Sequence, residues 1–261
     1  MSMIKFAKMH GNGNDFVIVN SLEKEFNPKK TLIKKLGDRN LGIGFDQMIH
    51  IGAPSKDNRD FTLKFYNADG GQANMCLNGV RCAATYVWDN KFAPKRALIF
   101  QTKKIDVECR PLKEGVEVIL KNPKYFVSQD LEKKLSKIIK TSFKLIDSGN
   151  LHLCIQKKNI DQLDLNGLYK KLEALLRPHG INLSIYSKDK ASCNIRTYEN
   201  GVGETLSCGS ASFCVAYLCL IDEIKKTTIK SSGGSIKFTK LDDRILMSGP
   251  TKFVYSGSFH E

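Results

Sequence analysis

The stretch NADGGQANMCLNGVRCAA, residues 67–84, places a cysteine between a polar, glycine-rich loop and an apolar run that predicts a buried helix. A second stretch, ENGVGETLSCGSASFCVA at residues 199–216, repeats this layout. In each, a polar residue stands nine positions before one cysteine and another cysteine follows six positions after it: Asn67, Cys76 and Cys82 in the first, and Glu199, Cys208 and Cys214 in the second. A Gly-Asn pair also precedes a strand-like run twice, at Gly13 and at Gly149. A repeat of this length predicts two duplicated domains of about 120 to 130 residues each.

Runs typical of β-strands dominate the chain outside these stretches, and many alternate apolar with polar residues, as strands buried on one face do. They are FVIVN, QMIHIG, FTLKFYN, ALIFQT, IDVECR, VEVILK, KLIDSG, HLCIQ, NIRTYE, TTIKSS, SIKFTK and RILMSG. The sequence therefore predicts sheets as the main element of each domain.

Two kinds of helix are predicted between these strands. Amphipathic helices are expected within residues 28–39, around Leu131 and Leu135, and from Leu165 to Leu176, before Pro178. The helices that follow the paired cysteines are instead apolar around most of their circumference, which predicts that other structure surrounds them. We therefore expect an α+β fold of two pseudo-symmetric domains, each a curved, mostly antiparallel sheet wrapped around a central helix.

Composition limits the classes of protein to consider. The chain has 261 residues, 41% of them apolar, which is enough for ordinary globular cores. No run approaches the ~20 apolar residues of a membrane span, and the first residues lack the pattern of a signal peptide, so we expect a cytoplasmic protein with reduced thiols and no membrane partner. The net charge is +14, but the basic residues are mostly dispersed lysines without a nucleic-acid-binding motif. A lysine-rich solvated surface is favoured over a nucleic-acid site.

The cysteines at the two predicted helix starts, Cys76 and Cys208, are the candidate catalytic residues. A helix N-terminus favours negative charge, so it can stabilise a thiolate and also bind a carboxylate. Zinc and redox sites usually have cysteines two to four residues apart, whereas here five residues separate the members of each pair, so no metal is expected. Six positions turn a helix by about 240°, so Cys82 and Cys214 should point away from the site and pack in the core, and the same is expected of the remaining cysteines: Cys109, Cys154, Cys193 and Cys219.

Two thiols at equivalent positions of two domains could face each other across one cleft. One thiolate would then remove a proton from a carbon while one thiol returns a proton to the opposite face. This is the geometry of a racemase or epimerase. For either cysteine taken alone, the alternative to a catalytic role is that it is an ordinary small residue at a helix start.

The motifs resemble those of the diaminopimelate epimerase family, which works without a cofactor. The likeness extends over nearly the whole chain through KMHGNGNDF, GDRNLGIGFDQ, YNADGGQANMCLNGVRC, GNLH, YENGVGETLSCGS and GPTKFVY. It implies epimerisation of LL-diaminopimelate to meso-diaminopimelate, in lysine and peptidoglycan precursor synthesis. It also implies an N-terminal domain of residues 1–122 completed by a final strand at 250–261, a C-terminal domain of residues 123–249, an active site in the cleft between them, and a homodimer.

The resemblance also assigns roles to particular residues. Cys76 and Cys208 match the acid/base pair, and His152 and Glu199 match the side chains that assist them. Further positions match residues that bind substrate, either through polar side chains or through backbone N–H groups at the two helix starts: Asn14, Gln47, Asn67, Leu77, Asn78, Asn150, Asn182, Asn200, Gly209 and Ser210.

Four positions depart from the family pattern. Leu77 and Ala211 stand where the family usually has glycine, and Leu151 stands where it usually has proline. Asn200 stands where the family typically has an arginine that pairs with the distal carboxylate, and an amide cannot reproduce the bidentate fork of a guanidinium. A related racemase acting on another amino acid is therefore the alternative. A phenazine-type isomerase or a binding protein would not be expected to carry both cysteines.

Overall fold

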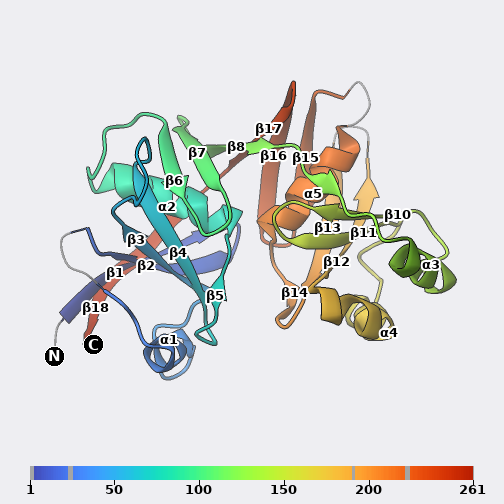
Figure 1. Ribbon diagram of the computed structural model, residues 1–261, viewed down its shortest axis with the longest axis horizontal. Coiled ribbons are helices and arrows are strands. Elements are labelled where there is room, and N and C mark those ends of the chain that lie inside the picture. Colours follow the sequence, from blue (N-terminus) through green and yellow to red (C-terminus); the bar gives the residue numbers. More distant parts are fainter. Residues whose placement is uncertain (1–2, 23–25, 190–191, 221–223, 261) are drawn as a thin grey trace. The chain divides into compact units, whose positions relative to one another are not determined.

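The computed structural model describes residues 3–22, 26–189, 192–220 and 224–260. The chain divides into two compact units, one of Met1–Ile119 with Ser248–Glu261 and one of Leu120–Met247 (Figure 1). The strands β8 (Val116–Lys121) and β17 (Arg244–Gly249) lie where the chain passes from one unit to the other.

The first unit is built on a mixed sheet. Its strands are β1 (Met3–Gly11), β2 (Asn14–Asn20), β3 (Gln47–Gly52), β4 (Phe61–Asn67), β5 (Gln72–Ala73), β6 (Leu98–Gln101), β7 (Asp106–Pro111) and β18 (Lys252–His260). Most neighbours pair antiparallel, including β1 with β2 and with β18, β3 with β4, and β6 with β7. Parallel pairing occurs between β2 and β3 and between β4 and β6, where a helix lies between the two strands in the chain.

The second unit repeats this order of elements. It contains β9 (Lys124–Tyr125), α3 (Gln129–Ile138), β10 (Phe143–Asp147), β11 (Leu151–Gln156), α4 (Leu165–Leu176), the 3-10 helix η1 (Arg177–His179), β12 (Asn182–Lys188), β13 (Ser192–Glu199), β14 (Gly203–Thr205), α5 (Gly209–Cys219), β15 (Lys226–Ser231) and β16 (Gly234–Leu241). The strands β11 and β12 pair parallel around α4, as do β13 and β15 around α5. The duplication predicted from the two cysteine stretches is therefore present in the topology.

A buried helix forms the centre of each unit. Helix α2 (Leu77–Asp89) packs against β1, β2, β3 and β7, and α5 packs against β11, β12, β13, β15 and β16. Gly79 allows α2 to approach its sheet closely, because a Cβ there would lie 2.9 Å from Ile49 Cδ1 and from Phe65 Cε1. The expected fold class, sheets wrapped on a central helix in two similar domains, is confirmed.

Amphipathic helices complete the cores. Helix α1 (Lys30–Gly37) turns Ile33 and Leu36 into a cluster with strands of the first unit. In the second unit α3 and α4 bury leucines against Leu153 and Ile155 of β11. Alternation along β11 assigns the residues between to the other face, among them His152, which bonds to a residue of α5. The outer helices thus cover one face of the sheet while the central helix receives the functional side chains from the other.

Two of the longer strands, β1 and β12, are not among the runs that the pattern of the sequence predicts. In β1, Lys8 occupies a buried position where alternation would place an apolar residue, and it pairs with Asp15. In β12 the buried Ser184 bonds to Thr197 of the adjacent β13. Both strands therefore contain a polar residue that becomes acceptable only when its partner on another strand is in place.

Candidate active site

The two cysteines at the centre of the repeat occupy the same structural position. Cys76 is the N-cap of α2 and Cys208 is the N-cap of α5, each with extended backbone, at φ −140° and −117°. Each backbone carbonyl opens its helix by accepting from the amide four residues later, Val80 N at 2.8 Å and Ser212 N at 3.0 Å. Neither thiol caps its own helix. The thiols therefore lie at the positive ends of the two helix dipoles, and neither is used to cap its helix.

In the first unit, strand ends bring the expected polar residues together. Asn14 begins β2, Gln47 begins β3 and Asn67 ends β4; β2 and β3 run parallel and β4 runs antiparallel, so all three lie at one edge of the sheet. Gln47 and Asn67 are directly paired across the ladder, and Gln47 Nε2 donates to Asn67 Oδ1 over 2.8 Å. The Cys76 thiol donates to Asn14 Oδ1 over 3.4 Å. Asn14, Gln47, Asn67 and Cys76 therefore lie close together in the first unit.

The second unit repeats this edge with different side chains. Asn182 begins β12 directly beside His152 of β11, and Glu199 ends β13. Asn182 Oδ1 accepts from the amide of Asn200 over 2.9 Å, and Glu199 Oε1 accepts from the Thr205 hydroxyl over 2.8 Å. Asn150 precedes β11, and its carbonyl accepts from the amide of Ser148. The expected residues of the C-terminal half therefore also cluster at one sheet edge.

A short relay connects His152 to the second cysteine. His152 Nε2 lies 2.9 Å from Ser210 Oγ, which lies 3.4 Å from Cys208 Sγ. Burial lowers the pKa of His152 to about 3, so the imidazole is neutral at physiological pH. Its Nδ1 is buried and has no hydrogen-bond partner among the described residues, which favours the proton on Nε2. His152 then donates to Ser210, and the Ser210 hydroxyl can donate to the Cys208 sulfur.

The other cysteines lie in the cores, as expected. Cys82, Cys109, Cys154 and Cys214 are each at most 1% exposed. Burial raises the pKa of Cys82 to about 12, and it also raises the pKa values of Cys109 and Cys214, so these thiols stay protonated. The last two, Cys193 of β13 and Cys219 of α5, are buried as well, with their sulfur atoms 2.7 Å apart.

The positions that depart from the family pattern have defined surroundings. The Tyr169 hydroxyl donates to Asn200 Oδ1 over 2.9 Å, and the Tyr169 ring stacks on Tyr198 with centroids 3.9 Å apart. Leu77 and Ala211 are buried in the first turns of α2 and α5. Asn200 is thus held by an aromatic pair, and its amide oxygen is already bonded.

Sequence reasoning missed several side chains that contact these residues. Arg81 donates to Asn78, Asp46 accepts from Asn14, and Tyr169 holds Asn200. Arg81 lies inside one of the quoted motifs, and its spacing of one helical turn from Asn78 was the available signal.

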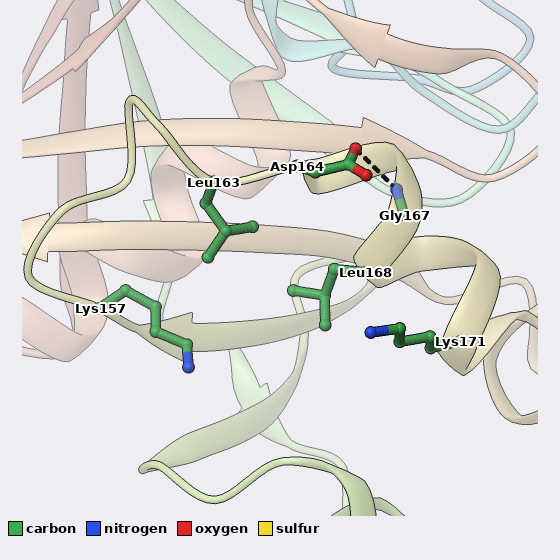
Figure 2. Close-up of a pocket in the computed structure, with 6 residues that line it drawn as sticks. All are labelled: Lys157, Leu163, Asp164, Gly167, Leu168 and Lys171. Atoms are coloured by element: carbon green, nitrogen blue, oxygen red, sulfur yellow. Dashed lines mark hydrogen bonds between the residues drawn. The ribbon is translucent and has the colours of Figure 1, made fainter.

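A pocket elsewhere in the second unit has a different character. It has a volume of about 260 Å³ and is lined by Lys157, Leu163, Asp164, Gly167, Leu168 and Lys171 (Figure 2). Asp164 caps helix α4 by accepting from the Gly167 amide over 2.9 Å, so the helix start is already satisfied by a carboxylate. Its lining has no thiol or imidazole, and we assign it no catalytic part.

The described part of the chain comprises residues 3–22, 26–189, 192–220 and 224–260. Within these ranges no group of three or more metal-ligating side chains is found. No helix in the described part of the chain is long and apolar enough to cross a membrane.

Comparison with solved structures defines the class of fold. A PhzF-family phenazine biosynthesis protein from Bacillus anthracis matches with a TM-score of 0.75 at 14% identity, covering all of both chains. A hydroxyproline epimerase from Agrobacterium vitis matches with a TM-score of 0.69 at 12% identity, covering 99% of this chain and 91% of the other. The fold is therefore one shared by PhzF-family proteins and amino-acid epimerases.

Comparison of sequences then places the chain in a family. A family model for diaminopimelate epimerase matches residues 6–124. The diaminopimelate epimerase of Wigglesworthia glossinidia brevipalpis is 34% identical over 98% of this chain and 100% of its own, and that of Pseudomonas entomophila is 31% identical over 98% of each. The chain belongs to the diaminopimelate epimerase family. The expected enzyme class, an isomerase, is confirmed.

Proposed function

We propose that the protein epimerises LL-diaminopimelate to meso-diaminopimelate without pyridoxal phosphate, in lysine and peptidoglycan precursor synthesis. The observation that carries the proposal is the placement of Cys76 and Cys208 at equivalent N-caps of two buried central helices. Relatives named diaminopimelate epimerase, 31% and 34% identical over nearly the full chain, support the choice of substrate.

The proposed reaction uses the thiols as an acid and a base. One cysteine, as thiolate, removes the α-proton, and the other, as thiol, protonates the opposite face of the resulting carbanion. In the reverse direction the roles exchange. The backbone N–H groups at the helix starts, at Leu77, Asn78, Gly209 and Ser210, bind the α-carboxylate and so favour the negative charge that develops beside the reacting carbon. The mechanism requires no cofactor.

The assisting residues act on the second cysteine and on the amino group. Ser210 and His152 form the relay that can donate to a Cys208 thiolate. Glu199, at the end of β13, provides a carboxylate for the substrate's α-ammonium group, with Thr205 fixing one of its oxygens. The amides at the two sheet edges complete the polar lining: Asn14, Gln47, Asn67, Asn150, Asn182 and Asn200.

The function is tested by incubating the purified protein with LL-diaminopimelate and a panel of other amino acids in deuterium oxide, without added pyridoxal phosphate. Diaminopimelate should gain α-deuterium and change configuration, and the Cys76→Ala and Cys208→Ala variants should do neither. Exchange into another amino acid in preference to diaminopimelate would favour a related racemase, the alternative that Asn200 supports. Near-normal turnover by either alanine variant would refute the two-thiol mechanism.

We also propose that the enzyme is a homodimer. Strand β18 exposes large apolar side chains: Phe253 at 58%, Val254 at 52% and Tyr255 at 42%. Exposed apolar side chains on a strand are suited to a partner surface. Light scattering of the purified protein should give twice the 29.3 kDa chain mass, and the Val254→Lys variant should give the monomer mass. A monomer at all concentrations for the native protein would exclude the dimer.

A further inference from the structure

Arg81 is a completely buried charge beside the first cysteine. It lies on α2, one turn and a half after Cys76, and its exposed fraction is 0%. Arginine is almost never fully buried unless it is paired, because removing a charge from water is costly. The packing of the helix does not require it, since the equivalent residue of the second unit is Phe213, which is 2% exposed on α5. The first unit therefore has a buried cation at a position where the second unit has a phenylalanine.

The fold leaves space for the guanidinium. A Cβ on Gly249 would lie 3.1 Å from Arg81 Cζ, and a Cβ on Gly11 would lie 3.3 Å from Arg81 Nη2. Both are closer than ordinary van der Waals contact, so larger residues at these positions would press on the side chain. The absence of a side chain at Gly11 and at Gly249 thus leaves room for the Arg81 guanidinium.

A chain of side-chain hydrogen bonds leads from Arg81 to Cys76. Arg81 Nη2 donates to Asn78 Oδ1 over 3.0 Å, and Asn78 Nδ2 donates to Asn14 Oδ1 over 3.3 Å. That same oxygen accepts from the Cys76 thiol over 3.4 Å, and Asn14 Nδ2 donates to Asp46 Oδ2 over 2.7 Å. Cys76 is therefore attached to the middle of a chain that ends in a cation and a carboxylate.

The two ends determine the orientation of both amides. A guanidinium can only donate, so Asn78 must turn its oxygen toward Arg81 and its NH₂ group toward Asn14. Asp46 accepts from Arg39 over 2.8 Å as a carboxylate, so Asn14 must turn its NH₂ group toward Asp46. Both requirements place the Asn14 oxygen against the Cys76 sulfur, without any choice left to the amides.

We infer that Arg81 is a positioning residue for Cys76, acting through Asn78 and Asn14, and that Phe213, at the equivalent position of α5, does not act on Cys208 in this way. The inference rests on the proposed acid/base role of Cys76. A cysteine that acts as both acid and base must be stable as a thiol and as a thiolate during turnover. The fixed Asn14 oxygen accepts from the thiol, and the buried charge of Arg81 stabilises the thiolate.

Several other titratable groups interact with Cys76 and Arg81. Burial lowers the pKa of Arg81, and electrostatic interactions with Cys82, Cys76 and Cys109 oppose that lowering; Cys82 also interacts with Cys76. Cys82 stays protonated, so it adds no charge at neutral pH. Further charges belong to the cluster beyond Asn14: Asp46, Asp15, Arg39 and Lys8.

The test is alkylation of the two cysteines, which needs no substrate. Iodoacetamide labelling of Cys76 and Cys208 is followed separately by mass spectrometry across pH in the native protein, in Arg81→Met and in the matched control Phe213→Met. Arg81→Met should raise the pH midpoint for Cys76 by about 0.5 to 1 unit, which slows its labelling about three- to tenfold at neutral pH, with Cys208 unchanged. Phe213→Met should move neither midpoint. An unmoved Cys76 midpoint, or an equal shift at both cysteines, would overturn the inference.

A second variant changes the opposite end of the chain and has the opposite sign. Asp46 is 44% exposed in its side chain, so Asp46→Asn should fold even if Arg81→Met does not. Removing this negative charge from the neighbourhood of Cys76 should lower the Cys76 midpoint and speed its labelling, while Arg81 and Asn78 still hold the Asn14 oxygen in place. A rise or no change would contradict the role of the chain. Loss of diaminopimelate turnover, in contrast, bears on the proposed function and leaves these labelling results as they stand.

Discussion

Ser210 Oγ lies 2.9 Å from His152 Nε2, with both side chains buried in the second unit. His152 is neutral, and its Nδ1 has no partner among the described residues. Ser210 can therefore donate a hydrogen bond to Cys208, but the imidazole behind it adds no positive charge. The two cysteines therefore have unlike supports, a neutral relay for Cys208 and a chain ending in a buried cation for Cys76.

The first prediction concerns Ser210→Ala, which removes the hydroxyl but keeps the backbone N–H proposed to bind the α-carboxylate. We expect kcat to fall about ten- to a hundredfold with KM nearly unchanged, because the loss affects proton transfer at Cys208 rather than substrate binding. Steady-state kinetics in both directions measures this. A rise in KM at constant kcat would instead assign Ser210 to binding alone.

The pKa of His152 makes a prediction about stability. Its pKa is depressed by burial from 6.5 to about 3, so the unfolded chain binds a proton in a range where the folded protein does not. The stabilising effect is complete above pH 6.5 and is lost as the pH falls toward 3, with a slope of up to about 1.4 kcal/mol per pH unit. Urea unfolding of the native protein and of His152→Gln between pH 4 and 8 should show this extra acid sensitivity only in the native protein. Equal slopes would contradict a neutral buried imidazole.

The buried sulfur pair predicts a specific oxidation product. Cys193 and Cys219 connect β13 to α5 with their sulfur atoms 2.7 Å apart. Treatment with diamide under mildly destabilising conditions should link them, and closing a loop of this length should raise the free energy of unfolding by about 3 kcal/mol. Peptide mapping identifies the bond, and Cys219→Ser is the control. A disulfide that joins Cys193 or Cys219 to any other cysteine would contradict the prediction.

Asn200 determines the next prediction. An arginine at this position could pair with a distal carboxylate, and a charge-assisted hydrogen bond contributes about 1.5 to 3 kcal/mol net. Asn200→Arg should therefore raise kcat/KM for diaminopimelate roughly ten- to a hundredfold, mainly through KM. Tyr169→Phe, which removes the donor to Asn200 Oδ1, should change KM with little effect on kcat. No gain from arginine would mean that this chain already has another cation for that carboxylate.

The sequence predicted the repeated elements because repetition and hydrophobic periodicity can be recognised from the order of residues alone, without knowing which residues are in contact. Both cysteines were placed at helix starts, and α2 and α5 are as deeply buried as their apolar circumference indicated. The strands β1 and β12 were missed because Lys8 and Ser184 break the apolar pattern, and their partners lie on other strands. Spacing alone could not show that Arg81 turns inward to Asn78, since a guanidinium on a helix is ordinarily solvated.

The central claim is that two thiols carry the proton transfers, and isotope content at low conversion tests it most directly. LL-diaminopimelate is incubated with the enzyme in deuterium oxide, the reaction is stopped at about a tenth of full conversion, and the α-deuterium of each stereoisomer is measured. With two bases, the removed proton stays on one cysteine while the other delivers deuterium from solvent. The account predicts meso product fully deuterated at the inverted carbon and residual LL substrate that is unlabelled. Product that retains protium at that carbon would show that a single base returns the proton it removed, and would contradict the account.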